Sequence, residues 1–136
     1  MNLRNDHLSP EAKELLDKMY AERGYELQYH RILAQFDPDL LKSLNTSYER
    51  LNFESKYLDP KTRELAFIGI LATEHEWVGL PIHFKRALNA GATEEEIMEV
   101  ICQMLVCIGL PTVLYTLEKW VEFLKKEGRY IGKEED

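Results

Sequence analysis

Glu64 is a carboxylate placed among large apolar residues, and proton transfer is the chemistry that such a group could support. On a helix it shares one face with Phe67, Ile68 and Leu71, because residues three, four and seven positions apart lie on the same side. A buried carboxylate must be paired, hydrogen-bonded or changed in protonation. Glu64 is therefore either a structural partner of a base, with Lys61, Arg63 or a later arginine as candidates, or a site residue.

His83 is the second candidate for proton transfer, since histidine is the side chain best suited to it near neutral pH. Leu80, Ala87 and Ala90 share its helix face, and the small alanines let another helix approach and enclose the imidazole. A satisfied core histidine would fit the same pattern. If Glu64 and His83 lie on adjacent antiparallel helices, the carboxylate would fix the tautomer of the ring.

Three further residues, His75, Glu76 and Trp77, fall at the expected break between the helices of Glu64 and His83. A metal site needs three or four convergent ligands, and adjacent residues on a helix diverge, so we expect no metal here. Trp77 is interpreted as a packing residue or as a pocket wall, and Glu76 is kept beside it as a candidate substrate-binding residue.

The two cysteines, Cys102 and Cys107, lie five positions apart in an apolar run. That spacing places them on different faces of a helix, so they are not expected to bond to each other. We expect both thiols to be buried and to act as small hydrophobic side chains. A redox or metal role is the alternative.

Helix-start signals recur along the chain and predict an all-α fold of about six helices. Ser9-Pro10, Asp37-Pro38 and Asp59-Pro60 each place a capping residue before a proline at the first helical position. Thr93 with Glu96 forms a capping box. Gly24, Gly91 and Pro111 mark other helix ends, and the segment 25–36 is ambiguous.

Two predicted helical stretches, 65–72 and 97–110, are apolar on nearly every side. A chain of 136 residues cannot easily bury both completely, so they belong at the centre of a bundle or across a subunit interface. This pattern predicts a homo-oligomer.

Length and charge restrict the class of protein further. With 136 residues the default is one domain, 1–136, with a core from 37 to 127 and a loose tail at 128–136. The net charge of −7 argues against nucleic acid and anionic membranes as partners. The N-terminus lacks the apolar stretch of a signal peptide, so a cytoplasmic location is expected.

The succession LDPKTREL, an apolar helix, a histidine, RALNAGATEEEIMEV and IGLP resembles the carboxymuconolactone decarboxylase family, which includes the alkylhydroperoxidase D-like proteins. The similarity covers residues 58–124. It implies an all-helical alkylhydroperoxidase D-like fold that assembles as trimers or hexamers, with sites close to subunit interfaces.

The two branches of this family differ in their site residues. The peroxidase branch carries a Cys-x-x-Cys pair whose positions are Glu76 and Gly79 here, and neither residue can replace a peroxidatic thiolate. Glu64 matches a glutamate of that branch, and Arg63 and His83 match residues of the decarboxylase branch. The decarboxylases have further carboxylates where Trp77 and Gly79 stand, so the resemblance does not extend to a particular lactone.

These observations lead to the hypothesis of a cofactor-free decarboxylase for a small organic acid or lactone. Arg63 would orient the carboxylate, His83 would donate the proton and Glu64 would set the tautomer and charge of the imidazole. The alternative is a non-catalytic oligomer, structural or small-molecule-binding, in which Glu64 and His83 form a buried polar contact. Residual peroxidase activity through Cys102 or Cys107 is disfavoured by their expected burial.

Overall fold

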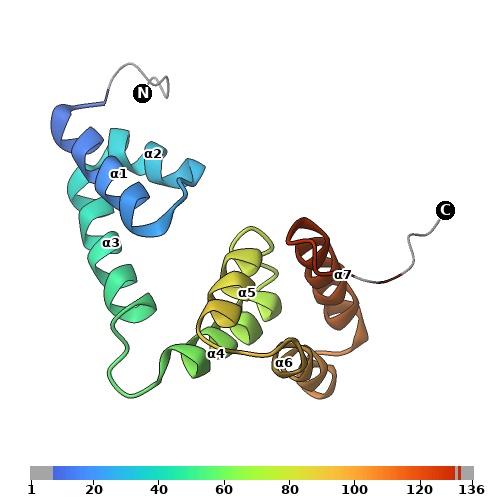
Figure 1. The fold of residues 1–136 in the computed structure, drawn as a ribbon. Coiled ribbons are helices and arrows are strands. Elements are labelled where there is room, and N and C mark those ends of the chain that lie inside the picture. Colours follow the sequence, from blue (N-terminus) through green and yellow to red (C-terminus); the bar gives the residue numbers. More distant parts are fainter. Residues whose placement is uncertain (1–7, 131, 133–136) are drawn as a thin grey trace. The chain divides into compact units, whose positions relative to one another are not determined.

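The protein is all-α, as the helix-start signals predict. A computed structural model describes residues 8–130 and 132, which contain seven α-helices and no strand (Figure 1). The chain forms two compact units, one reaching to Glu54 and one starting at Ser55. The expectation of a single domain with a core from 37 to 127 stays a prediction.

From residue 8 onward, the first unit contains three helices that pack on one another: α1 (Pro10–Arg23), α2 (Gln28–Phe36) and α3 (Pro38–Asn52). The predicted caps are present, because the Ser9 hydroxyl accepts from Ala12 N–H and the Asp37 carboxylate accepts from Leu40 N–H. Gly24 ends α1 with φ 78°, a left-handed conformation that favours glycine. The core of the unit consists of Ala12, Leu16, Met19, Ala34 and Leu41.

The ambiguous segment 25–36 contains the helix α2, which raises the number of helices from about six to seven. No side chain at its N-cap, Leu27, accepts a hydrogen bond from the helix. Instead the Leu27 N–H donates to Nδ1 of His30, at 3.1 Å. At this helix start the acceptor is a histidine side chain three residues after the N-cap. Helix starts are usually recognised in a sequence by Ser, Thr, Asp or Asn at the N-cap itself.

The described part of the second unit contains four helices: α4 (Pro60–Thr73), α5 (Leu80–Asn89), α6 (Glu94–Cys107) and α7 (Leu110–Lys126). Helix α4 packs on α5, α6 and α7, and α7 also packs on α5 and α6. The rings of Phe84 and Trp120, both in the core of this unit, meet edge to face with centroids 4.9 Å apart. Figure 1 shows α4 and α5 side by side.

The helix α4 is held at its start by two interactions. The Asp59 carboxylate accepts from the backbone N–H of Thr62 at 2.9 Å and from its hydroxyl at 2.8 Å, and these hydrogen bonds hold the pKa of Asp59 below its usual range. Lys61 donates to Glu96 at 2.9 Å, which joins α4 to α6 and lowers the pKa of Glu96. Lys61 is thus engaged away from Glu64.

The expected burial of the two cysteines is wrong. Cys102 and Cys107 are exposed, and both are free thiols. The helix α6 turns only one stripe, Ile97, Ile101 and Met104, toward the core of the chain. The apolar neighbours of the cysteines in the sequence therefore do not imply that the cysteines themselves are covered.

The helices α6 and α7 pack on each other. Apolar side chains remain exposed on both helices and on the turn between them. We call them the α6–α7 apolar surface: Leu105, Val106, Ile108, Leu110, Leu114 and Tyr115. An open depression of about 300 Å³ lies within this region, lined by Leu110, Pro111, Leu114, Tyr115 and Glu118.

Within the described residues, none of the helices combines the length and the apolar character needed to span a bilayer. Of the expected loose tail, residues 131 and 133–136 lie outside those described. At its start, Arg129 pairs with Glu94 at 2.8 Å, and Tyr130 packs against the core of the second unit.

Candidate functional site

Glu64 occupies a position on α4 that its sequence pattern assigns to the core. The buried stripe of the helix runs through Glu64, Ile68 and Ala72, which are four residues apart and so lie above one another. The Glu64 residue is only 2% exposed. An ionisable side chain thus continues an apolar stripe and requires polar partners inside the protein.

His83 occupies the equivalent place on α5. Leu80, His83, Phe84 and Ala87 form the buried face of this helix, and His83 is 6% exposed. The side chain of Phe67, from α4, packs against the imidazole with ring centroids 4.7 Å apart. Helix α4 thus supplies an aromatic neighbour for the imidazole.

The structure brings these two residues together. Nδ1 of His83 lies 2.6 Å from Oε2 of Glu64, a short and buried contact across the α4–α5 packing. A carboxylate accepts, so Nδ1 carries the proton of this hydrogen bond. The pairing that the spacing on two helices suggested is therefore present. Its catalytic role stays a prediction.

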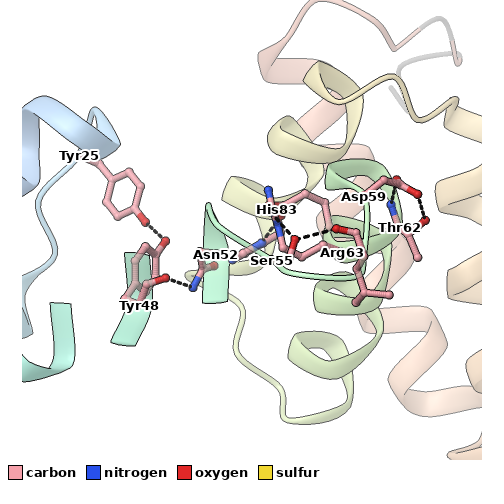
Figure 2. A network of polar contacts seen from close by, with 10 residues as sticks. Tyr25, Tyr48, Asn52, Ser55, Asp59, Thr62, Arg63 and His83 are labelled. Atoms are coloured by element: carbon pink, nitrogen blue, oxygen red, sulfur yellow. Dashed lines mark hydrogen bonds and ion pairs between the residues drawn. The ribbon is translucent and has the colours of Figure 1, made fainter. Parts of the chain in front are cut away.

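Arg63 extends the network on the other side of the carboxylate. Its Nε lies 3.5 Å from Oε1 of Glu64 in an ion pair, and its Nη1 donates to the hydroxyl of Ser55 at 2.7 Å. That hydroxyl in turn donates to the carbonyl of Leu58 at 2.8 Å. Figure 2 shows Ser55, Arg63 and His83 gathered at this place.

We refer to Ser55, Arg63, Glu64 and His83 as the Ser55–His83 network. Three of its members were candidates from the sequence, and Ser55 was not. Ser55 lies in the connection between α3 and α4, where a serine carries no helix periodicity and no capping signal. Ser55 also precedes Arg63 by eight residues, a separation that predicts no contact because a loop and the first turn of α4 lie between the two.

The other two sequence candidates, Glu76 and Trp77, contact residues outside this network. The Glu76 carboxylate accepts from the backbone N–H of Gly79 at 2.7 Å and from that of Val78 at 3.3 Å, at the start of α5. The Trp77 ring stacks on His75, with centroids 5.3 Å apart, and packs against the core. A role for either in binding substrate stays a prediction.

His75 takes part in the turn between α4 and α5 rather than in a cluster of ligands. It has φ 56°, which is unusual for a residue with a side chain, and its Nε2 lies 3.2 Å from the hydroxyl of Thr112 on α7. This contact and the stacking on Trp77 hold the turn in place. Among the described residues, no group of three or more His, Cys, Asp or Glu side chains is arranged to hold a metal ion.

Comparison with known proteins adds the family to this geometry. The sequence profile of the carboxymuconolactone decarboxylase family matches residues 38–122. The chain belongs to the carboxymuconolactone decarboxylase family. The matched region includes α4 and α5 and therefore Arg63, Glu64 and His83, as the resemblance in the sequence predicted.

Two relatives match this chain over about half of its length. A nitrosuccinic acid decarboxylase of Metarhizium robertsii is 30% identical over 76 residues, which are 54% of this chain and 53% of the relative. An uncharacterised protein of Methanocaldococcus jannaschii is 35% identical over 74 residues, 54% of this chain and 67% of the relative. The chain thus spans about half of the first relative and two thirds of the second.

The chemistry open to the network follows from its charges. It contains one permanent cation, one carboxylate and one imidazole, within contact distance and almost fully buried. Because Glu64 occupies Nδ1, a proton transfer to or from a ligand would use Nε2 of His83. An arginine beside such an imidazole is suited to a substrate that carries a carboxylate.

Proposed function

We propose that this protein catalyses the cofactor-free decarboxylation of a small organic acid through His83, Glu64 and Arg63. The buried contact between Nδ1 of His83 and Oε2 of Glu64 carries the proposal, because it fixes one tautomer of a proton-transferring group. Membership of a family named for decarboxylation, and a relative named as a nitrosuccinic acid decarboxylase, support the reaction class.

In the proposed reaction, the bond between the substrate carboxylate and the adjacent carbon breaks and CO2 leaves. Its electron pair moves into a neighbouring electron-withdrawing group, a carbonyl or a nitro group, which gives an enolate or a nitronate. Nε2 of His83, protonated from water while Nδ1–H stays bonded to Glu64, then delivers its proton to the carbon, and the ring returns to the neutral Nδ1–H tautomer. Glu64 holds the tautomer and balances the charge of the protonated ring.

Arg63 would hold the carboxylate until the bond breaks. Two of its three nitrogens already face protein groups, since Nη1 donates to Ser55 and Nε faces Glu64. The contact with substrate would therefore run through the Nη2 end of the guanidinium. Trp77 and Glu76 are retained as candidate contacts for the rest of the substrate.

The test is CO2 release from two probe acids, nitrosuccinic acid and 4-carboxymuconolactone, by the purified protein and its variants. His83→Gln should lower the turnover rate by a factor of about 10²–10⁴, the usual contribution of general acid catalysis. Lys85→Gln is the matched control, because Lys85 is on the same helix and its exposed side chain pairs with Glu127, away from the Ser55–His83 network. This variant should keep the rate of the parent protein.

Two outcomes would contradict the proposal. One is turnover of a probe acid that survives His83→Gln. The other is the absence of CO2 release from both acids combined with a His83→Gln variant that loses only stability, which would favour the structural oligomer. A homo-trimer or homo-hexamer and a cytoplasmic location belong to the same proposal and await their own measurements.

A further inference from the structure

Ser55 uses its hydroxyl twice, and both bonds are short. The hydroxyl accepts from Nη1 of Arg63 at 2.7 Å and donates to the carbonyl of Leu58 at 2.8 Å. A hydroxyl has one proton, so the donation to Leu58 leaves the oxygen lone pairs toward the guanidinium. The loop before α4 thus anchors a fixed acceptor beside Arg63, as the dashed lines of Figure 2 show.

The orientation of Arg63 depends on this acceptor. A guanidinium is planar and rigid, so fixing Nη1 also restricts where Nε points. Nε is buried, lies 3.5 Å from Oε1 of Glu64 and makes no hydrogen bond to any described residue. The ion pair alone therefore does not provide the directional bond that would hold the plane, and Ser55 provides it.

The contacts join into one chain from the loop to the imidazole. Leu58 anchors Ser55, Ser55 orients Arg63, Arg63 faces one oxygen of Glu64, and the other oxygen holds His83. A carboxylate held from both sides has little freedom to rotate. Its acceptor oxygen then stays directed at Nδ1 of the imidazole.

We propose that Ser55 is a positioning residue of the Ser55–His83 network, acting through Arg63 and Glu64 to hold His83 in its Nδ1–H tautomer. The functional consequence rests on the proposed decarboxylation, whereas the geometric consequence does not. Ser55 touches neither the imidazole nor, in the proposed reaction, the substrate. Its loss should therefore affect the rate of the proton transfer more than the binding of the acid.

The experiment compares three variants. Ser55→Ala removes both hydrogen bonds, and Ser55→Thr keeps the hydroxyl. Ser43→Ala is the matched control, since it removes an exposed serine hydroxyl that donates to the Asp39 carbonyl at 3.0 Å, on a helix outside the Ser55–His83 network. Thermal unfolding establishes that each variant is folded before the next measurement.

The first readout is the tautomer of His83, measured by NMR from long-range correlations between the ring nitrogen-15 nuclei and the ring protons. The signals of His83 are identified by their absence from the spectrum of His83→Gln. The parent protein, Ser55→Thr and Ser43→Ala should show the Nδ1–H form, and Ser55→Ala should show a mixture of both tautomers. An unchanged tautomer in folded Ser55→Ala would overturn the proposal. This readout needs no substrate, so it can succeed or fail independently of the decarboxylase function.

The second readout applies to a probe acid that the parent protein decarboxylates. Ser55→Ala should lower kcat by roughly 10-fold to 100-fold, the equivalent of one hydrogen bond to a charged group, with a smaller change in KM. Ser55→Thr should restore most of the rate. A raised KM with an unchanged kcat would overturn the positioning role, because Ser55 would then serve only substrate binding.

Discussion

Nδ1 of His83 lies 2.6 Å from Oε2 of Glu64, although nineteen positions separate the two residues in the chain. Each comes from the buried stripe of its own helix, so the packing of α4 on α5 makes the contact. An isolated helix would leave either side chain without the other. The site is therefore a property of the helix pair.

Removing the Glu64 acceptor should lower the free energy of unfolding of the second unit, and the loss should be larger when more buried polar groups lose their partner. Glu64→Leu leaves the Nδ1–H of His83 and the Arg63 charge without a partner, and breaking a buried pair in this way costs about 3–5 kcal/mol. Glu64→Gln keeps an acceptor and should cost clearly less. Urea unfolding followed by tryptophan fluorescence measures this, because Trp77 and Trp120 both belong to the second unit.

Glu122→Leu is the control for that comparison, since Glu122 is exposed and pairs with Lys119 at 3.1 Å on the surface. It should cost about 1 kcal/mol or less. Equal losses for Glu64→Leu and Glu64→Gln would contradict the importance of the buried acceptor.

The first unit should lose stability in mildly acidic solution because of His30. Burial, followed by the nearby Arg23 charge, lowers the pKa of His30 from its ordinary value of 6.5 to about 4. Both neighbours of its ring nitrogens, Leu27 N–H and Arg23 Nη1, are donors, so a protonated ring would face donors on both sides. The folded state therefore favours the neutral ring.

The sign of the effect follows from proton binding. Between pH 6.5 and about 4, His30 is protonated in the unfolded chain and neutral in the folded one. The stability it contributes is fully present above pH 6.5 and is lost as the pH falls toward 4, on the order of 3 kcal/mol in all. Urea unfolding followed by circular dichroism at pH 4.5 and 7.5 would measure the loss.

The His30→Gln variant isolates this contribution, because glutamine cannot take up a proton in that range. Its free energy of unfolding should depend less on pH than that of the parent protein. His75→Gln, which changes an exposed histidine, is the control and should keep the parent dependence. Parallel pH profiles for the parent and His30→Gln would show that His30 has no such role.

The α6–α7 apolar surface should carry the predicted self-association. Val106 is 91% exposed in the single chain, and apolar residues so exposed on neighbouring elements are typical of protein interfaces. Val106→Lys should shift the protein toward the monomer of 16.0 kDa in light scattering. Thr46→Lys adds the same charge at an exposed position of α3 and should leave the oligomer intact.

Thiol labelling provides an independent check of that surface. Cys102 lies one turn before Val106 on the same side of α6 and is exposed in the single chain. In a Cys107→Ser background, Cys102 should react slowly in the oligomer and faster after Val106→Lys. A monomeric parent protein, or fast labelling that Val106→Lys does not change, would contradict an interface at this place.

The helices and the family could be predicted from the sequence because their signals are local. A capping side chain such as Asp59 bonds to a backbone group three residues away, and Thr93 with Glu96 forms the predicted reciprocal box. Among the described helices, α2 alone was left ambiguous by the sequence, since its start uses His30, a residue type that carries no capping preference.

Burial and long-range contact were decided by the tertiary structure. The apolar surroundings of Cys102 in the sequence suggested a covered thiol, yet each helix turns only one stripe toward the core of its own chain, and the thiol lies off that stripe. The sequence alone nominated Arg63, Glu64 and His83, because each can be placed on a helix face. Ser55 became part of the site only through folding, since a loop residue has no periodicity and its bond to Arg63 depends on where the loop returns to α4.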